Sequence, residues 1–164
     1  MRNTVDYVIR PLTGDDEALL WEMLYQALHT AAGAKAPPRD IVRRPELARY
    51  VEGWGRAGDT GFVAHETGEN HLLGAVWLRL PVREDNSRGG GDEVAPELAF
   101  AVTSGQRGRG IGTALLTQLM RANPHHSAVS LAVGPTNPAV RLYERFGFRV
   151  VQQTEGSVLM RREL

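Results

Sequence analysis

The feature that most constrains this chain is a glycine-rich turn between an apolar strand and an amphipathic helix. Residues 97–102 are short and mostly apolar, which is typical of a buried strand, and residues 113–120 carry apolar side chains at helical spacing. Between them Gly108, Gly110 and Gly112 alternate with larger residues. Glycines let a ligand approach the backbone, and the first amides of a helix lack intrahelical acceptors. The turn is therefore predicted to bind a phosphate or pyrophosphate.

Several classes of phosphate site have a glycine-rich turn of this kind. A P-loop needs a lysine after its last glycine, and none follows Gly110 or Gly112. A Rossmann turn has a different glycine spacing and stands near the start of a βαβ unit, whereas this turn comes late in the chain. The remaining alternatives are the pyrophosphate of coenzyme A and a glycine turn without a ligand. Arg107, Gly110 and Gly112 after an apolar strand resemble the acyl-CoA loop of the GCN5-related N-acetyltransferase (GNAT) superfamily.

A second motif strengthens this resemblance. Asn137, Tyr143 and the pair Gly147-Phe148 are spaced like a helix of the same superfamily, although Val140 stands where the family commonly has alanine. The resemblance covers residues 97–160, and residues 1–80 match only in the order of their elements.

Composition limits the other functional classes. The 164 residues suit one domain, 1–164, and the 19 basic residues equal the 19 acidic ones, so no net field attracts nucleic acid or an anionic membrane. The absence of cysteine excludes disulfides and thiolate metal sites. The chain has neither a long apolar run nor an apolar leader, so a cytoplasmic location is expected. The oligomeric state is not determined by the sequence, and a homodimer is possible.

Hydrophobic periodicity predicts the order β-α-α-β-β-β-α-β-α-β-β. The strands are expected at 7–10, 60–66, 72–80, 97–102, 127–133, 148–151 and 158–162, and the helices at 13–28, 45–54, 113–120 and 137–146. Residues 29–44 are interpreted as a mobile connection. The order matches the GNAT fold, which implies an α/β protein with a mixed, mostly antiparallel sheet flanked by helices. The resemblance also implies a splay between the fourth and fifth strands.

The candidate site residues follow from these two motifs. The expected contacts to acetyl-CoA come from the turn, the central strand and the later helix: Ala101, Val102, Arg107, Gly108, Arg109, Gly110, Ile111, Gly112, Thr113, Asn137 and Tyr143. For each arginine a solvated basic turn is the alternative, and for Asn137 a helix cap is one. No metal is expected, since the pair at 125–126 has no carboxylate at ligand spacing.

Two side chains are candidates for proton transfer. Glu97 shares a strand face with Ala99 and Ala101, which leaves room for a substrate beside a general base. A solvated edge residue is the alternative for Glu97. By resemblance Tyr143 is the general acid for the leaving thiolate, and a core aromatic is its alternative.

These features predict an acetyl-CoA-dependent N-acetyltransferase that acts on a primary amine in a ternary complex. A non-catalytic acyl-CoA-binding module on the same fold is the main alternative, and a nucleotide-phosphate binder is a weaker one. The polar segments 29–44 and 81–96 are predicted to wall the acceptor site, because both exceed ordinary connections in length.

Overall fold

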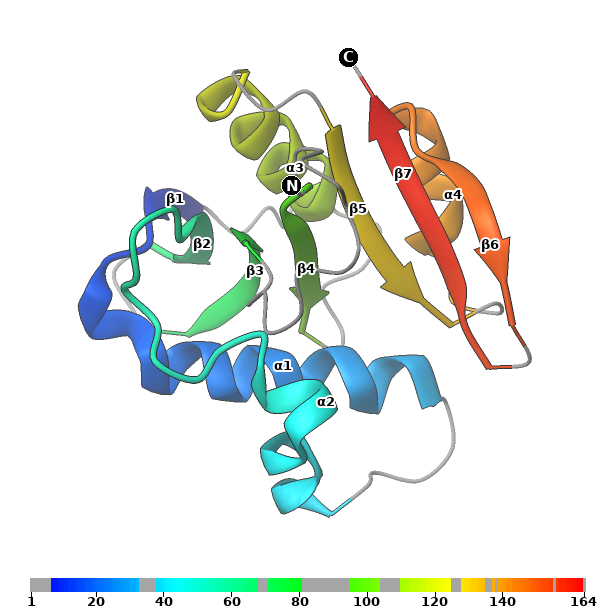
Figure 1. The fold of residues 1–164 in the computed structure, drawn as a ribbon. Helices are drawn as coiled ribbons and strands as arrows, with labels where there is room; N and C mark the ends of the chain where they lie inside the picture. Colours follow the sequence, from blue (N-terminus) through cyan, green and yellow to red (C-terminus); the bar gives the residue numbers. More distant parts are fainter. Residues whose placement is uncertain are drawn as a thin grey trace, which may run out of the picture.

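A computed structural model describes residues 7–32, 38–67, 71–80, 95–103, 110–124, 128–134, 137, 139–154 and 156–163. In this part of the chain seven strands form one sheet in the order β1-β2-β3-β4-β5-β7-β6 (Figure 1). The strands are β1 (Tyr7–Pro11), β2 (Thr60–Glu66), β3 (Leu72–Arg79), β4 (Glu97–Val102), β5 (Ala128–Val133), β6 (Arg149–Gln153) and β7 (Val158–Glu163). The predicted bounds of β2 and β4 are confirmed to the residue.

The sheet opens between β4 and β5. These two strands are parallel and register at one pair, Glu97 with Ser130, while the other neighbours in the sheet are antiparallel. The Ser130 N–H donates to the Pro96 carbonyl at 3.0 Å beside that pair. Beyond it the two strands diverge, as Figure 1 shows. The predicted α/β class, with a mixed sheet splayed between its fourth and fifth strands, is confirmed.

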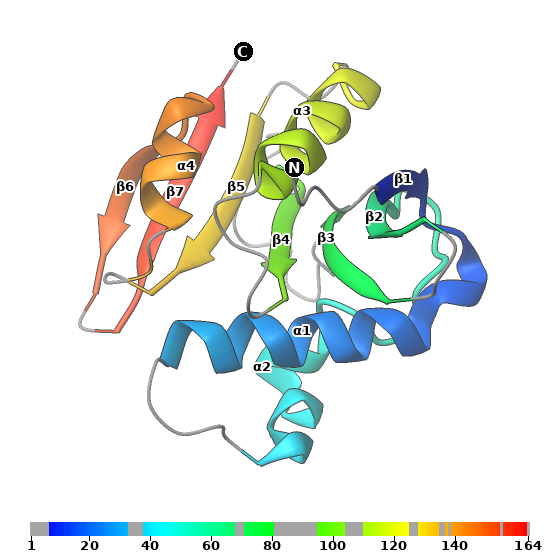
Figure 2. The same ribbon diagram turned by 180° about the vertical axis from the view of Figure 1, so that it is seen from behind.

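Helices cover both faces of the sheet. The helix α1 (Glu17–Ala32) lies with η2 (Arg39–Arg43) and α2 (Pro45–Ala48) on one face, and α3 (Ile111–Ala122) and α4 (Ala139–Arg145) lie on the other (Figures 1 and 2). No helix among the described residues is long and apolar enough to cross a membrane.

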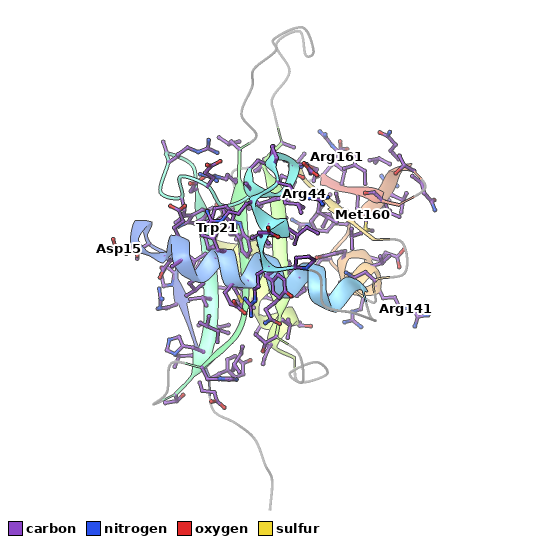
Figure 3. All side chains as sticks on the ribbon, turned by 90° about the horizontal axis from the view of Figure 1, so that it is seen from below. Asp15, Trp21, Arg44, Arg141, Met160 and Arg161 are labelled. Carbon is purple, nitrogen blue, oxygen red and sulfur yellow. The ribbon has the colours of Figure 1, made fainter. Side chains whose placement is uncertain are left out.

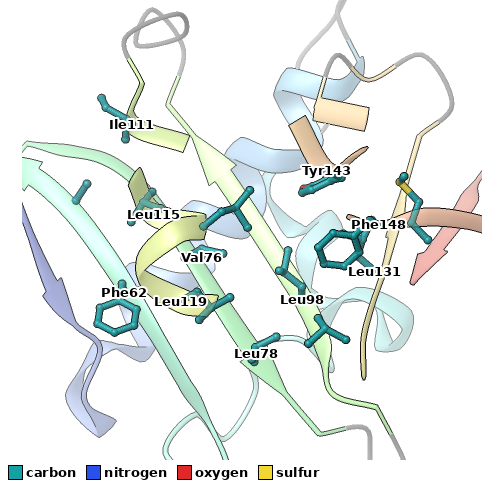
Figure 4. Packing of buried hydrophobic residues seen from close by; sticks show 14 of the residues in the cluster. Phe62, Val76, Leu78, Leu98, Ile111, Leu115, Leu119, Leu131, Tyr143 and Phe148 are labelled. Carbon is teal, nitrogen blue, oxygen red and sulfur yellow. The ribbon is translucent and has the colours of Figure 1, made fainter. Parts of the chain in front are cut away.

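Two hydrophobic clusters correspond to these two layers. Because successive strand residues point to opposite faces, Val63 and Ala75 pack toward α1, whereas Phe62 and Val76 pack toward α3. The cluster on the α3 side includes Leu98, Leu115 and other residues labelled in Figure 4. The β4 strand contributes to both clusters, so its backbone lies between the two layers.

The chain enters α1 through the predicted capping box. The Asp15 N–H donates to Thr13 Oγ1 at 3.2 Å, and the Thr13 N–H donates to Asp16 Oδ2 at 2.7 Å. The box begins a short 3₁₀ turn, η1 (Gly14–Asp16), which leads directly into α1. Arg10 adds two hydrogen bonds of 3.0 Å to the Asp16 carboxylate.

The interpretation of residues 29–44 as a mobile connection was wrong for most of that segment. Residues 29–32 continue α1, and residues 39–43 form the 3₁₀ helix η2. Val42 is buried, and the Arg43 guanidinium stacks 3.8 Å from the centre of the Trp21 ring. Apolar and cation–π contacts to α1 therefore order a segment whose sequence shows little periodicity.

The second helix is also shorter than predicted. It spans Pro45–Ala48 rather than continuing to Trp54, and residues 49–53 form turns. The carbonyl of Arg49 accepts a hydrogen bond from Arg79, and that of Tyr50 accepts one from Trp77. These carbonyls would serve the next helical turn, so side chains of β3 compete with its continuation.

Candidate active site

The open edge of β4 offers backbone groups between the two layers. The Thr103 N–H donates to the Leu73 carbonyl on the β3 side, whereas the Pro96 carbonyl faces β5. Backbone groups alternate between the two neighbours of a strand, so Val102 presents its amide and carbonyl toward β5. Ala101 directs its amide and carbonyl toward β3, and its side chain is buried under α1. Of the two predicted contacts on β4, Val102 is thus the one placed at the opening.

The N-terminus of α3 lies beside this opening. Gly110 caps the helix in the left-handed conformation, with φ of 80°, and no side chain caps it. The first helical hydrogen bond runs from the Ala114 N–H to the Gly110 carbonyl at 3.0 Å. The N–H groups of Ile111, Gly112 and Thr113 therefore have no intrahelical acceptor. A Cβ atom built on Gly110 would have no atom within 4 Å among the described residues.

The residues of the turn have different roles in packing. Ile111 is 1% exposed and belongs to the core, which leaves only its backbone for a ligand. A Cβ atom on Gly112 would lie 2.7 Å from Phe100 Cζ and 3.2 Å from Leu142 Cδ2. Gly112 is thus required for the approach of α3 to β4 and α4, a reason that the motif alone did not give. Arg107, Gly108 and Arg109 lie outside the described residues.

Tyr143 lies on α4 and faces the inner side of the opening. It is 5% exposed, and its ring packs 5.9 Å from both Phe100 and Phe148 between ring centroids (Figure 4). Its hydroxyl has no hydrogen-bond partner among the described residues, and the oxygen is not completely buried. Burial raises the pKa of the Tyr143 phenol above its ordinary value, so the hydroxyl keeps its proton at neutral pH.

Asn137 stands at the start of α4 as a cap. Its Oδ1 accepts a hydrogen bond of 2.9 Å from the Ala139 N–H, and its carbonyl accepts one of 3.1 Å from the Val140 N–H. The capping alternative is therefore observed. The Nδ2 group is left for the predicted contact to acetyl-CoA, which stays a prediction.

Glu97 lies at the narrow end of the opening, where β4 and β5 still pair. Its side chain is 13% exposed and accepts hydrogen bonds at both oxygens. Arg49 Nη1 donates to Oε1 at 2.6 Å, Arg49 Nη2 donates to Oε2 at 3.1 Å, and the Tyr50 hydroxyl donates to Oε2 at 2.5 Å. The carboxylate is thus neither a solvated edge residue nor a free base. The hydrogen bond to Glu97 raises the pKa of the Arg49 guanidinium, and burial, with the Glu97 charge, raises the pKa of the Tyr50 phenol.

Sequence reasoning missed Arg49 and Tyr50. They follow a short helix and precede Glu97 by 48 and 47 residues, respectively, and no motif marks them. The only available signal was an arginine and a tyrosine side by side within the helix predicted at 45–54, outside the two segments, 29–44 and 81–96, that were predicted to line the acceptor site. Residues 81–94, most of the second segment, lie outside the described residues.

Two side chains of β3 fix the main chain that carries this pair. Trp77 Nε1 donates to the Tyr50 carbonyl at 2.9 Å, and Arg79 Nη1 donates to the Arg49 carbonyl at 3.2 Å. Arg79 also pairs with Asp59 at 3.2 Å, and both side chains are 3% exposed. The positions of Arg49 and Tyr50 over Glu97 therefore rest on buried polar contacts.

The described residues contain no group of three or more histidine, cysteine, aspartate or glutamate side chains that could hold a metal ion. The histidine pair at 125–126 lies outside them.

Comparison with known proteins identifies the family. The model of the Acetyltransferase (GNAT) family matches residues 21–148, so this chain belongs to the GNAT acetyltransferases, as the two motifs predicted. No curated protein matches the sequence significantly.

Solved structures with this fold cover nearly the whole chain. The PaiA N-acetyltransferase from Thermoplasma acidophilum, in complex with coenzyme A, is 18% identical with a TM-score of 0.68, over 97% of this chain and 99% of that one. YncA from Salmonella typhimurium, with its cofactor acetyl-CoA, is 22% identical with a TM-score of 0.65, over 97% of this chain and 94% of that one. A GCN5-related N-acetyltransferase from Kribbella flavida is 24% identical with a TM-score of 0.65, over 96% of this chain and 98% of that one.

Proposed function

We propose that this protein transfers the acetyl group of acetyl-CoA directly to a primary amine within a ternary complex. The observation that carries the proposal is the opening between β4 and β5, with the bare N-terminus of α3 and Tyr143 on one face of the sheet and Glu97 on the other. Such an opening admits two substrates from opposite faces, so that they meet at the strand backbone.

The α3 turn suits the pyrophosphate of acetyl-CoA. Three backbone N–H groups lack intrahelical acceptors there, the helix dipole favours an anion, and Gly110 leaves space for it. The relatives from T. acidophilum and S. typhimurium hold coenzyme A and acetyl-CoA in their structures, which supports the same ligand here. The outward backbone of Val102 suits the pantetheine arm, and its N–H suits the thioester carbonyl oxygen.

The proton steps fall to the two faces of the opening. The acceptor arrives as an ammonium ion and gives one proton to the Glu97 carboxylate, which leaves an amine with a free electron pair. That pair forms the bond to the thioester carbon, the carbon–sulfur bond then breaks, and the nitrogen loses its second proton. Tyr143 donates the proton that the departing thiolate takes up, a role that its retained hydroxyl proton suits. The second proton of the nitrogen balances the one that Tyr143 regains, and the proton on Glu97 is released. The products are an N-acetyl amine, coenzyme A and one proton.

A pair of substitutions at Gly110 tests the cofactor site. Asparagine and aspartate are nearly equal in size and both tolerate the left-handed conformation at this position, so they differ mainly in charge. Gly110→Asp is expected to weaken acetyl-CoA binding at least about tenfold relative to Gly110→Asn, because its carboxylate would repel the pyrophosphate. Titration calorimetry measures both affinities, and equal affinities in two folded variants would contradict this site.

Thiol release with a panel of amines tests the activity itself. Because the chain has no cysteine, every thiol that appears comes from coenzyme A. Tight binding of acetyl-CoA without release by any amine would favour the non-catalytic acyl-CoA-binding alternative.

A further inference from the structure

The contacts of Glu97 bear on what the acceptor must carry. Three donors already occupy the carboxylate: two nitrogens of Arg49 and the hydroxyl of Tyr50. With these three donors in place and a side chain that is 13% exposed, the Glu97 carboxylate offers little room to a further ligand. One donor must therefore move before an ammonium ion can reach Glu97.

The two donors differ in their freedom to move. Tyr50 is half-buried, its carbonyl is held by Trp77, and its hydroxyl donates to Oε2 of Glu97. The Arg49 main chain is held by Arg79, and its guanidinium also donates to the Tyr50 hydroxyl at 3.1 Å and lies 4.4 Å from the centre of the Tyr50 ring. The Arg49 side chain is nevertheless 46% exposed, whereas that of Glu97 is 13% exposed. Arg49 is thus the donor that can leave while the backbone and Tyr50 stay in place.

Leaving Glu97 is unfavourable for Arg49 unless another anion replaces it. Glu97 is its one ion-pair partner in the described part of the chain. A simple amine that displaced Arg49 would exchange one ion pair for another and leave the guanidinium unpaired. An acceptor with both an ammonium and a carboxylate would form two pairs, one with Glu97 and one with Arg49, so that no charge at the site loses its partner.

We propose that the acceptor carries a carboxylate close to the amine that is acetylated, as an amino acid does, and that Arg49 determines this specificity. Arg49 moves from Glu97 to the acceptor carboxylate, which it holds through the same two nitrogens, and the acceptor ammonium takes its place at Glu97. The planar guanidinium fork fits carboxylates in two-pronged geometry, which is the way Arg49 already binds Glu97. This inference rests on the proposed function and adds the chemical class of the acceptor.

Matched acceptors test it. Wild-type kcat/KM is measured by thiol release for the standard amino acids and for the corresponding amino acid amides, which keep the amine and lose the carboxylate. For the best substrate, the acid is expected to exceed its amide by about 10- to 100-fold, the range for one hydrogen-bonded charged contact. Comparable rates for acids and amides would overturn the inference while leaving the acetyltransferase intact.

Substitutions at Arg49 locate the preference. Arg49→Gln is expected to reduce the ratio of kcat/KM for the acid to that for the amide to about three or less, and to leave the affinity for acetyl-CoA unchanged. Arg49→Lys should keep part of the preference, because lysine supplies a point charge without the guanidinium fork. The matched control is Arg141→Gln, which removes an exposed arginine of α4, on the other face of the sheet, that has no ion pair among the described residues (Figure 3).

The outcomes separate the two proposals. An acid preference that survives Arg49→Gln would overturn the role of Arg49, and an equal loss in Arg141→Gln would show that general surface charge causes it. If no acid, amide or simple amine releases thiol while acetyl-CoA binds, the proposed function fails, and this inference fails with it.

Discussion

Arg79 and Glu97 face each other across β3 and β4, and Arg49 bridges them. The Arg49 carbonyl accepts from Arg79, while the Arg49 guanidinium donates to Glu97. A buried cation on one strand thus fixes the residue that neutralises a carboxylate on the next. The buried pair Arg79–Asp59 therefore serves mainly to position Arg49, and its net contribution to stability is small.

Arg79→Met should destabilise the protein strongly. It leaves the Asp59 carboxylate buried without its cation, which is expected to reduce the free energy of unfolding by about 3–5 kcal/mol. Urea unfolding measures the change. Arg161→Met is the matched control, since its ion pair with Glu163 is exposed and should contribute less than about 1 kcal/mol. Equal losses in the two variants would contradict the role assigned to Arg79.

Asp16→Asn should destabilise the protein in a pH-dependent way. The hydrogen bond from Arg10 is the main reason that the pKa of Asp16 is lowered in the folded chain. The stabilisation is therefore complete above the unfolded pKa of about 3.9 and is lost as the pH falls through the folded value. Near neutral pH we expect a loss of about 1 kcal/mol, as for other helix caps.

Thermal unfolding of both proteins between pH 7 and strong acid measures this difference. It should begin to shrink below about pH 4, where the carboxyl of the unfolded wild-type chain becomes protonated, and should shrink further until the pH falls below the folded value. Asp15→Asn serves as the control, because Asp15 is exposed and has no ion pair among the described residues, so its loss near neutral pH should be smaller. A difference that stayed constant down to strong acid would exclude the ionised capping contact as its cause.

Gly112→Ala should destabilise the junction of α3 and β4. Its methyl group would lie 2.7 Å from Phe100 Cζ, and such overpacking costs about 1–3 kcal/mol. Phe100→Leu in the same chain should recover part of the loss, which a double-mutant cycle detects as coupling. Gly134→Ala, where a Cβ meets no atom of the described residues within 4 Å, should change stability by less than about 0.5 kcal/mol. Additive effects at 112 and 100 would contradict the contact.

Tyr143→Phe tests the proposed acid. The substitution keeps the ring that packs on Phe100 and Phe148 but removes the hydroxyl. We expect kcat to fall about 100-fold with little change in KM for acetyl-CoA, because the proton is needed as charge develops on sulfur. Tyr7→Phe controls for a general effect of losing a phenol. An unchanged kcat, with chemistry shown to limit the rate, would exclude this role.

The pH profile gives a second test of Tyr143. Since burial raises the pKa of its phenol, loss of the Tyr143 proton should not reduce the rate until the pH exceeds the ordinary tyrosine value of about 10. An alkaline decline well below that value, absent in the Phe variant, would contradict the buried, protonated state.

Short apolar runs bounded by turn residues predicted the strands that pack on both faces. The strands at 60–66 and 97–102 were placed correctly, and each contributes side chains to both core clusters. The positive φ of Gly147, 92°, follows from its place at the end of a helix. These features depend on local sequence.

The features that the sequence did not predict depend on distant contacts. The early end of α2 results from β3 side chains that take the carbonyls of Arg49 and Tyr50. The neutralised state of Glu97 depends on the same two residues, and the packing role of Gly112 depends on Phe100. No local pattern encodes such contacts, since each joins separate elements.

The most direct test of the central claim is the stoichiometry of acetyl transfer by the wild-type protein. Thiol released from acetyl-CoA and acetylated amine, identified by its mass, are measured in the same reaction, with and without acceptor. Direct transfer predicts one acetylated amine for each thiol, no release above the buffer rate without acceptor, and no acetylated protein. Thiol release without acetylated amine, or an acetylated protein that forms before the amine is added, would contradict it.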